Sequence, residues 1–469
     1  MRVFDFHTKE NAGNAAPKPQ DVFAVFSDRA HILYLDSADR AHPDSRYSFV
    51  MFEPDAVISS QTHSSSEAFA AMRALLSAYK PAATHSHAEL PPFIGGLAGF
   101  LGYDLGRALE DLPSLAKADP DLPEFCMGLY SQLYAYDHKH ERGMLITHER
   151  AGRSDDSAEG DAQSREQDWL AQFQAAQSQT PPLSFTPVSL AWRENFTQSA
   201  YEDSFARITE YICAGDIFQA NMTRRFDAPC GGVPAAAHYL NLRQVNPAPF
   251  AGYFDAGACI LSSASPERFL RLDKSGRVIA RPIKGTARQD TSDPQRDIEQ
   301  REALLSSAKN RAENIMIVDL MRNDLARSCA PHSIEVPELC VLESFAGLHH
   351  LVSTVSGQLA ADKDVFDLLA GCFPGGSITG APKIRAMEII EELEPTRRGA
   401  YCGAMGYIGF DGAMDMNILI RTLVYKGDSV SFQVGGGIVT DSDPAEEYAE
   451  TLTKAHKILE SFTRINDVR

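Results

Sequence analysis

The sequence predicts a fold of the α/β or α+β class, and two observations lead to this prediction. Short runs of β-branched and aromatic residues recur along the chain, for example at 31–35, 251–255 and 268–272, as expected for strands. Longer segments with apolar residues at helical spacing, such as 384–393, alternate with them. Because several strand runs are also neighbours in the sequence, we expect sheets that are covered by helices.

The N-terminal region, residues 1–148, combines strands with one helix. We expect strands at 31–35 and 49–52 and an alanine-rich helix over 66–79. The glycine-dense segment 95–103 predicts a strand edge where a second backbone packs closely. A nucleotide-binding loop is not expected there, because no G-x-G-x-x-G motif follows a convincing strand.

Residues 149–194 differ in character from what precedes them. The stretches 153–160 and 172–182 are polar and contain few large apolar side chains, which is typical of a linker or a surface excursion. We therefore divide the chain into the N-terminal region, this polar segment, and a catalytic region over 195–465.

The catalytic region contains denser structural signals. A capping-box pattern at Ser199–Glu202 predicts the start of a helix, which leads into a strand over 219–226. A long helix is expected over 297–311 and could continue to 322. Further strands are expected at 251–255, 258–263, 268–272 and 277–283.

Composition limits the classes of partner. The chain has 469 residues and a net charge of −19, which argues against nucleic acid or an anionic membrane as its main partner. An anionic substrate would need local cations or a metal. The eight cysteines form no C-x-x-C pair, so a zinc knuckle or disulfide framework is not indicated. No signal-peptide core and no run of about 18 apolar residues is present, and we expect a soluble cytoplasmic protein.

Two segments that follow strand runs carry candidate catalytic side chains. Lys284 lies in Arg281–Thr286, between a proline and a glycine, at the end of a strand, where rigid scaffolds often present reactive groups. Glu267 lies in Ser265–Phe269 beside a proline turn. Taken alone, each is more often a solvated loop residue. A hairpin between them would bring the two side chains close together.

A glycine-rich loop and two acidic segments could bind ligands. The loop 375–383 opens a helix, whose N-terminal N–H groups attract anions, but it lacks the Lys-Ser/Thr of a triphosphate loop. Asp443 and Glu446 form a helix cap, while Glu447, Glu450 and Lys454 share one helix face. This face is either solvated or part of a Mg²⁺ site. Glu313 interrupts an apolar helix face, which is costly for an unpaired carboxylate.

Taken together, these segments resemble the chorismate-utilising enzymes over about residues 195–462. The resemblance rests on five motifs: Gly-Asp-Ile-Phe-Gln at 215–219, Ser-Pro-Glu-Arg-Phe at 265–269, Pro-Ile-Lys-Gly-Thr at 282–286, the loop 375–383 and the acidic helix 446–454. It implies an α/β sandwich in which two large, mainly antiparallel sheets pack together with helices outside.

The resemblance also implies roles for individual residues. Glu313 and Glu450 would hold Mg²⁺, with Glu447 close by, and Glu267 would be the general acid or base. The substrate carboxylates would be held by Arg421 and by the backbone around Thr379, Gly380, Gly436 and Gly437, while His350 would line the ring pocket. Gln219 stands where isochorismate-forming relatives carry a water-activating lysine, so hydration chemistry is disfavoured.

Lys284 indicates the branch of the family that makes 4-amino-4-deoxychorismate, the precursor of p-aminobenzoate and folate. The anthranilate-forming branch has alanine at this position. By resemblance, Lys284 would form a covalent intermediate with chorismate, without pyridoxal phosphate. No G-x-C-x-G nucleophile elbow of a glutaminase is present, so ammonia would come from a separate glutamine amidotransferase subunit in a heterodimer.

Two alternative functions and one further pocket stay open. Anthranilate synthesis is the nearer alternative, and a non-catalytic interaction protein that retains the fold is the remote one. In the N-terminal region, the segments 35–38 and 44–47, with 249–250, loosely resemble the tryptophan pocket of the family. The residues concerned are Ser37, Arg46, Pro249 and Phe250. The sequence does not decide whether tryptophan binds or regulates.

Overall fold

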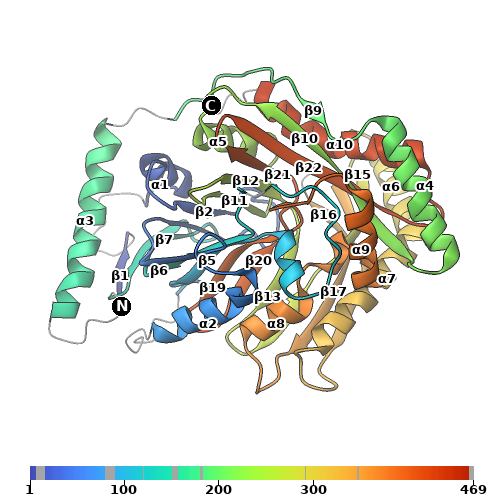
Figure 1. Cartoon of the computed structure of the whole chain (residues 1–469). Coiled ribbons are helices and arrows are strands. Elements are labelled where there is room, and N and C mark those ends of the chain that lie inside the picture. The colour runs from blue at the N-terminus through green and yellow to red at the C-terminus, as the bar shows by residue number, and fades with distance from the viewer. Residues whose placement is uncertain are drawn as a thin grey trace.

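Two large antiparallel sheets form the centre of the molecule (Figure 1). The computed structural model describes residues 1–6, 16–79, 90–119, 121–149, 157–179, 183–290, 292–345 and 348–463. Within these residues every named pair of neighbouring strands is antiparallel. The predicted fold class is therefore confirmed.

The first sheet combines strands from both halves of the chain. Its spatial order is β1 (Arg2–Asp5), β8 (Arg142–Thr147), β7 (Gln132–Asp137), β3 (Tyr47–Met51), β2 (Leu33–Asp36), β11 (Phe250–Asp255), β12 (Ile260–Ser265), β21 (Thr422–Lys426), β22 (Ser429–Ile438), β10 (Gln219–Pro229) and β18 (Gly380–Ala381). A short strand, β9 (Arg193–Glu194), also pairs with β10.

The second sheet is built in the same mixed way. Its order is β15 (Ile283–Arg288), β17 (Leu348–Gln358), β14 (Arg277–Ala280), β13 (Arg268–Leu272), β20 (Met414–Asn417), β19 (Ala404–Gly409), β5 (Gly96–Leu101), β6 (Phe125–Tyr130) and β4 (Ala56–Ser59), and β16 (Glu335–Phe345) pairs with β17. Because N-terminal strands lie beside C-terminal ones in both sheets, the two regions share one framework.

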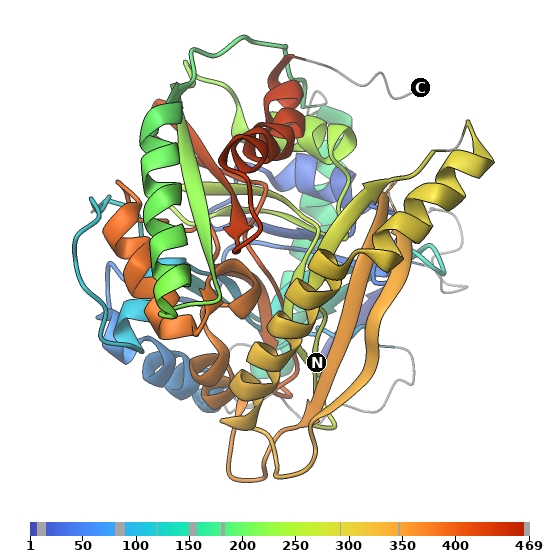
Figure 2. The ribbon, with the colours of Figure 1, turned by 90° about the vertical axis from the view of Figure 1, so that its right-hand side faces the viewer.

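The helices lie outside the sheets (Figures 1 and 2). They are α1 (Pro19–Phe26), α2 (Ala68–Ala78), α3 (Ser157–Gln179), α4 (Gln198–Ala214), α5 (Ala235–Val245), α6 (Pro294–Ser306), α7 (Ala308–Ala326), α8 (Val365–Cys372), α9 (Lys383–Leu393) and α10 (Pro444–Thr463). Figure 2 shows α7 running beside the long strands β16 and β17. None of these helices is long and apolar enough to cross a membrane, among the residues described above.

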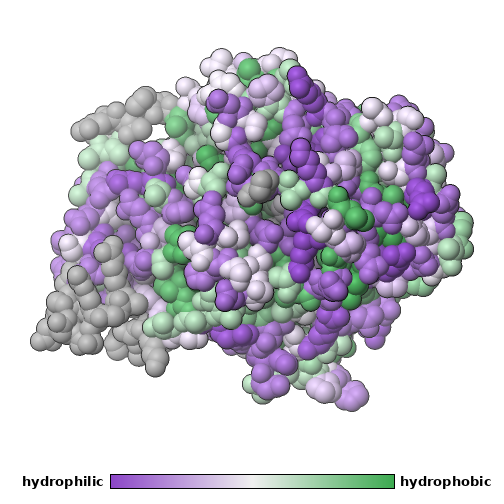
Figure 3. Space-filling view, viewed as in Figure 1, coloured by the Kyte–Doolittle hydropathy of each residue, from purple (hydrophilic) through white to green (hydrophobic). Residues whose placement is uncertain are grey.

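Aromatic and aliphatic side chains fill the space between the sheets. Phe254 of β11 and Phe100 of β5 meet edge to face with ring centroids 6.3 Å apart, and both side chains are fully buried. Each such residue contributes roughly 1.5–3 kcal/mol to folding by leaving water. Outside this core, hydrophilic residues are interspersed with small hydrophobic areas on the face shown in Figure 3.

Glycines allow the backbones of the second sheet to approach one another, as the glycine-dense segment predicted. A Cβ atom at Gly96 would lie 2.2 Å from the carbonyl oxygen of Ile408, and one at Gly99 would lie 2.1 Å from that of Cys126. The prediction of an edge is wrong, however, because β5 lies between β19 and β6. Close packing on both sides explains why side chains are excluded here.

Two helix predictions need correction. Helix α4 is capped by Thr197, whose side chain accepts a hydrogen bond from the Ala200 N–H, and not by the predicted box at Ser199. The long helix expected from 297 is two helices, α6 and α7, because Ser307 has an extended backbone. The Ser307 hydroxyl accepts a hydrogen bond from the Asn310 N–H and so begins a second helix.

The polar segment 149–194 contains the helix α3, which the sequence analysis did not expect. Its side chains Trp169 and Phe173 are buried and stack against each other with ring centroids 5.3 Å apart. They pack beside Phe26 of α1. Stacking of Trp169 on Tyr134 of β7 and the ion pair of Glu166 with Arg2 of β1 attach this helix to the first sheet.

Buried neutral histidines predict a loss of stability in mild acid. His238 of α5 is fully buried, with Nδ1 2.6 Å from the Tyr425 hydroxyl and Nε2 3.0 Å from that of Ser461. Burial lowers its pKa to about 3. The unfolded chain takes up this proton near the ordinary His value of about 6.5, so His238 should cost about 2 kcal/mol of stability between pH 7 and pH 5.

The variant His238→Gln lacks this titration. Its deficit in free energy of unfolding relative to the wild type should therefore shrink by about 2 kcal/mol from pH 7 to pH 5. Urea unfolding of both proteins at the two pH values measures this, and other titrating groups cancel in the difference. A deficit that is the same at both pH values would contradict a neutral buried His238.

Candidate active site

The two candidate catalytic side chains lie on either side of one serine. Ser377 donates a hydrogen bond from Oγ to Glu267 Oε1 over 2.8 Å, and its carbonyl oxygen lies 3.4 Å from Lys284 Nζ. Glu267 directly precedes β13, and Lys284 is the second residue of β15. The β13–β14 hairpin that separates them in sequence thus places them in one site.

A local irregularity directs Lys284. The pairing of β15 with β17 shifts register between Lys284 and Thr286, and the intervening Gly285 has a φ of +79°. A bulge of this kind bends a strand and changes the direction of a side chain. Gly285 permits this conformation, which other residues rarely adopt.

Burial shifts both groups away from their charged forms. It lowers the pKa of Lys284, although the carboxylates of Glu313 and Glu267 act in the opposite direction. It raises the pKa of Glu267, against the hydrogen bond from Ser377 and the charge of Lys284. A neutral amine is a nucleophile and a protonated carboxyl group is an acid. Burial therefore shifts Lys284 towards its nucleophilic form and Glu267 towards its proton-donating form.

A buried arginine, Arg398, stabilises the loop 375–381 by hydrogen bonds to the backbone. Arg398 donates to the carbonyl oxygens of Ile378 over 2.8 Å and Asn221 over 2.9 Å, and it also pairs with Glu394. The carbonyl oxygen of Thr379 accepts from the Asn221 N–H over 2.8 Å. The loop is therefore rigid where it presents Ser377.

Gly380, Gly437 and Gln219 meet where the loop joins the first sheet. Gly380 has a φ of +153°, and a Cβ atom there would lie 2.2 Å from the Gln219 carbonyl oxygen. A Cβ at Gly437 would lie 2.3 Å from Gln219 Nε2. Gln219 Nε2 donates to Asn221 Oδ1 over 2.9 Å, whereas its buried Oε1 has no partner among the described residues. This orphaned oxygen can accept a hydrogen bond from a ligand.

Arg421 is the candidate anion-binding group of the site. In the part of the chain that the structure describes, its guanidinium has no hydrogen-bond or ion-pair partner. Burial lowers its pKa, and Glu267 is the charged group that opposes this. An unpaired, partly buried guanidinium is costly, and a bidentate carboxylate would relieve that cost.

His350 is a buried, neutral residue of β17. It lies in β17 opposite Thr286 of β15 and is buried. Burial, together with the charge of Arg421, lowers its pKa to about 4. The imidazole is therefore neutral at physiological pH and suited to contact an uncharged ring.

The acidic helix α10 lies against the glycine-rich strand β22. A Cβ at Gly436 would lie 3.0 Å from Glu447 Oε2 and 4.0 Å from Glu450 Oε1. Glu450 pairs with Lys454 over 2.7 Å, as its helical spacing predicted, and Lys454 also donates to the Gly435 carbonyl oxygen. Asp443 accepts from the N–H groups of residues 445 and 446 and so caps the helix.

Glu313 of α7 is close enough to Glu447 and Glu450 of α10 to interact with their charges. Burial raises the pKa of Glu313, and the charges of Glu447 and Glu450 raise it further against Lys284 and Lys309. Burial and Glu450 likewise raise the pKa of Glu447. These carboxylates therefore influence one another, and a cation between them would be stabilising.

This donor set fits Mg²⁺. Among the described residues, no three His, Cys, Asp or Glu side chains are gathered as a complete metal-binding group. Mg²⁺, however, commonly takes one or two carboxylates and completes its shell with water and substrate oxygen atoms. Glu313, Glu447 and Glu450 provide such carboxylates.

The residues of the possible tryptophan pocket are only partly brought together. Ser37 follows β2, and Phe250 begins β11, its partner strand, so the two are neighbours with Pro249. The Ser37 hydroxyl donates to the Tyr47 carbonyl oxygen. Arg46 instead points to Asp137, with which it makes a bidentate ion pair.

Sequence reasoning missed the residues that link these groups. Ser377 bridges Lys284 and Glu267, and Arg398 supports the loop that carries it. Ser377 lies in a segment that the sequence analysis singled out, but no pattern distinguished it from its neighbours. Arg398 lay outside every motif, because its role depends on contacts with distant segments.

Comparison with known proteins identifies the class. The chain matches the family of chorismate binding enzymes over residues 30–460, and it belongs to this family. It is 40% identical to aminodeoxychorismate synthase component 1 of Escherichia coli (strain K12), over 94% of this chain and 95% of that protein. It is 41% identical to anthranilate synthase component 1 of Thermus thermophilus, over 80% and 79%.

The fold of a solved relative agrees with this assignment. Anthranilate synthase component I from Streptococcus pneumoniae superposes with a TM-score of 0.74 and 30% sequence identity, covering 91% of this chain and 93% of that one. The two-sheet framework of this chain, in which N- and C-terminal strands are neighbours, is therefore the fold of a chorismate-utilising enzyme.

Proposed function

We propose that this chain is the chorismate-aminating component of an aminodeoxychorismate synthase, which converts chorismate and ammonia to 4-amino-4-deoxychorismate. One observation carries the proposal: a partly buried lysine and a buried glutamate flank Ser377 at 3.4 Å and 2.8 Å. The 40% identity to the Escherichia coli relative of that name supports it.

In the first step, Lys284 acts as the nucleophile. Its neutral amine attacks ring C2, the two ring double bonds shift, and the C4–O bond breaks. Glu267 donates its proton to the departing hydroxyl group, which leaves as water. The lowered pKa of Lys284 and the raised pKa of Glu267 both favour the protonation states that this step requires.

In the second step, ammonia replaces the lysine. It attacks C4, the double bonds shift back, and the C2–N bond to Lys284 breaks. The amine of Lys284 is then free for the next cycle. Glu267, now a carboxylate, is placed to take a proton from the attacking nitrogen.

The substrate is a dianion, and the pocket offers a matching set of groups. Arg421 would hold one carboxylate bidentately, together with the backbone of Thr379, Gly380, Gly436 and Gly437. Glu313, Glu447 and Glu450 would hold Mg²⁺, which when bound neutralises the second carboxylate. His350 would contact the ring, and Gln219, which cannot act as a base, would donate or accept hydrogen bonds.

Anthranilate synthesis is the alternative function, favoured by the 41% identity to the Thermus thermophilus relative. In that reaction ammonia is added at C2. A lysine that already approaches C2 would block this path, so the presence of Lys284 beside Ser377 favours addition at C4.

Ammonia would be supplied by a partner. A separate glutamine amidotransferase would release ammonia from glutamine, because the chain has no G-x-C-x-G nucleophile motif. The isolated chain would therefore use free ammonia directly. The whole reaction is an amino-group transfer to chorismate on the route to p-aminobenzoate.

The variant Lys284→Ala tests the covalent mechanism. It should lose most formation of 4-amino-4-deoxychorismate and gain some 2-amino product, because ammonia can then reach C2. Wild-type enzyme with chorismate and Mg²⁺ but no nitrogen source should gain the mass of chorismate minus water on the Lys284 peptide. Product analysis by chromatography and intact-protein mass spectrometry measure both effects.

Two further variants sharpen this test. Glu267→Gln should suppress the adduct and slow turnover by about 10²–10⁴-fold, since the hydroxyl group no longer receives a proton. Lys274→Ala, at an exposed turn, should behave as wild type. The covalent mechanism is wrong if Lys284→Ala makes the 4-amino product at the wild-type rate and no adduct forms.

Removing either predicted metal ligand should abolish the response to Mg²⁺. We expect Glu313→Gln and Glu450→Gln each to lose activity and the rise in melting temperature that MgCl₂ gives the wild type. Without metal, both should melt near the wild-type temperature, because burial disfavours the charge of Glu313 and the exposed Glu450–Lys454 pair contributes little.

Glu446→Gln is the matched control, since this exposed residue lies on the same helix. It should retain both activity and the Mg²⁺-induced shift. Full activity of either ligand variant, or of wild-type enzyme treated with EDTA, would refute the metal assignment.

The isolated chain should use ammonium salts but not glutamine. At alkaline pH, where free NH₃ is present, chorismate should be consumed with ammonium chloride. With glutamine it should be consumed only after a glutamine amidotransferase subunit is added. Glutamine-dependent turnover by the rigorously purified single chain would show that it contains its own glutaminase site.

A further inference from the structure

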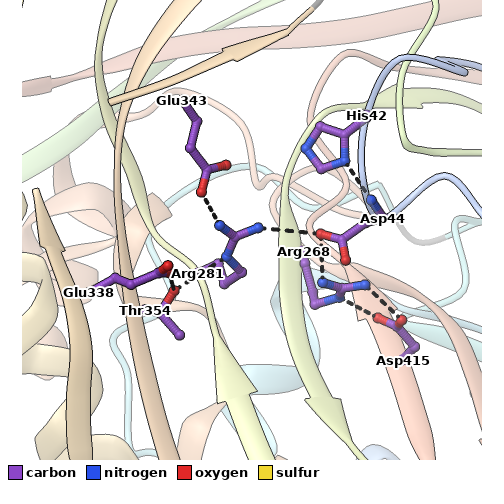
Figure 4. Close-up of polar contacts among 8 residues, drawn as sticks. All are labelled: His42, Asp44, Arg268, Arg281, Glu338, Glu343, Thr354 and Asp415. Carbon is purple, nitrogen blue, oxygen red and sulfur yellow. Dashed lines mark hydrogen bonds and ion pairs between the residues drawn. The ribbon is translucent and has the colours of Figure 1, made fainter. Parts of the chain in front are cut away.

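A polar network beside the active site joins an N-terminal residue to the segments that carry Lys284 and Glu267 (Figure 4). Asp44 lies in the connection between β2 and β3. Its Oδ2 atom is 3.0 Å from a terminal nitrogen of Arg268 and 3.5 Å from one of Arg281. One carboxylate oxygen therefore serves two guanidinium groups.

Both arginines are close in sequence to the catalytic side chains. Arg268 directly follows Glu267, and Arg281 precedes Lys284 by three residues. Asp44 therefore connects the chain segment before the β13–β14 hairpin to the segment after it. A shift of either arginine would move the backbone that carries a catalytic residue.

The hairpin itself does not hold these ends together. The β13–β14 pairing runs through Arg271–Ile279 and Leu272–Val278. Towards its open end, Arg268 pairs with Asn417 of β20, whereas Ala280 pairs with Val355 of β17. At this end the two strands no longer pair with each other. Asp44 instead connects the two chain segments through Arg268 and Arg281.

Each arginine is also anchored on its own side. Arg268 makes a bidentate ion pair with Asp415 over 2.8 Å and 3.1 Å, and its guanidinium lies over the Phe250 ring. Arg281 pairs with Glu343 and lies 3.4 Å from the Thr354 hydroxyl group. Without Asp44, the two arginines would be held by separate strands, and their positive charges would repel each other.

The segment that carries Asp44 is itself fixed. The Asp44 N–H donates to His42 Nδ1 over 3.1 Å, and the Ser45 N–H donates to the His42 carbonyl oxygen over 3.0 Å. The Ala38 N–H donates to the Ala248 carbonyl oxygen. The side chain of Asp44 is 20% exposed and that of Arg268 only 5%, so their attraction is screened less than at the surface.

We propose that Asp44 is a positioning residue, which sets the distance between the Lys284 amine and the Glu267 carboxyl group across Ser377. It acts through Arg268 and Arg281 and does not contact substrate. The proposal rests on the proposed function, in which these two groups act in one step. A misplacement of about 1 Å in such a pair can cost about 100-fold in rate.

The test compares Asp44→Asn with wild type, using chorismate, Mg²⁺ and saturating ammonium chloride. Asp44→Asn keeps the shape of the side chain but removes its charge. It should lower kcat by about 10-fold to 100-fold and change KM for chorismate by less than about threefold. Asp44→Glu, which keeps the carboxylate, should have a kcat between those of Asp44→Asn and wild type.

Asp5→Asn is the matched control. Asp5 of β1 pairs with Arg142 of β8 over 2.5 Å, and this ion pair lies at the far edge of the first sheet. The variant loses a comparable ion pair and should keep kcat within about twofold. If Asp44→Asn shows no cooperative urea transition, Arg281→Lys, which keeps the charge, should show the same selective loss of kcat.

The outcomes separate the two proposals. If wild type does not consume chorismate with ammonium, the proposed function fails. If wild type is active, the positioning role is refuted by a kcat of Asp44→Asn, or of Arg281→Lys where that variant is used, within twofold of wild type. It is also refuted if Asp44→Glu is no better than Asp44→Asn.

Discussion

The burial of an amine beside a carboxyl group is the constraint on which the rest of the site depends. In water, Lys284 would be an ammonium, which has no lone pair for attack, and Glu267 would be a carboxylate, which has no proton to donate. Desolvation shifts both pKa values towards the neutral forms. Such burial is costly, and it requires a rigid surrounding: the bulged strand β15 on one side, and the loop of Ser377, held by Arg398, on the other.

The distribution of charge follows from the same requirement. The chain carries a net charge of −19, yet Arg421 stands without an ion-pair partner in the described part of the chain, close enough to Glu267 for each to influence the other's pKa. Burial and the charges of Glu447 and Glu450 raise the pKa of Glu313, and burial and Glu450 raise the pKa of Glu447. Under the proposed function, a dianionic substrate and Mg²⁺ would satisfy both sides at once. This explains how an acidic protein could bind an anion without an overall attractive field.

The N-terminal region shares both sheets with the region that carries the candidate catalytic residues. Strand β2 lies beside β11, and β5 lies beside β19, so both sheets are completed by N-terminal strands. The contact of Asp44 with Arg268 and Arg281 is a polar counterpart of this arrangement. Under the proposed positioning role, Asp44 of the N-terminal region would determine how accurately the catalytic groups are aligned.

The sequence by itself determined the class of fold and several of the strands, and it singled out the segments of the candidate site. Local patterns suffice for these, because strand propensity, helical spacing and glycine content are properties of neighbouring residues. It did not determine the break before α7, which the local cap by Ser307 makes, nor the attachment of α3 or the central position of β5, which depend on packing against distant segments. The same holds for Ser377, Arg398 and Asp44. Their roles arise from hydrogen bonds and ion pairs that join residues 20 or more positions apart, and only the tertiary structure decides which such pairs meet.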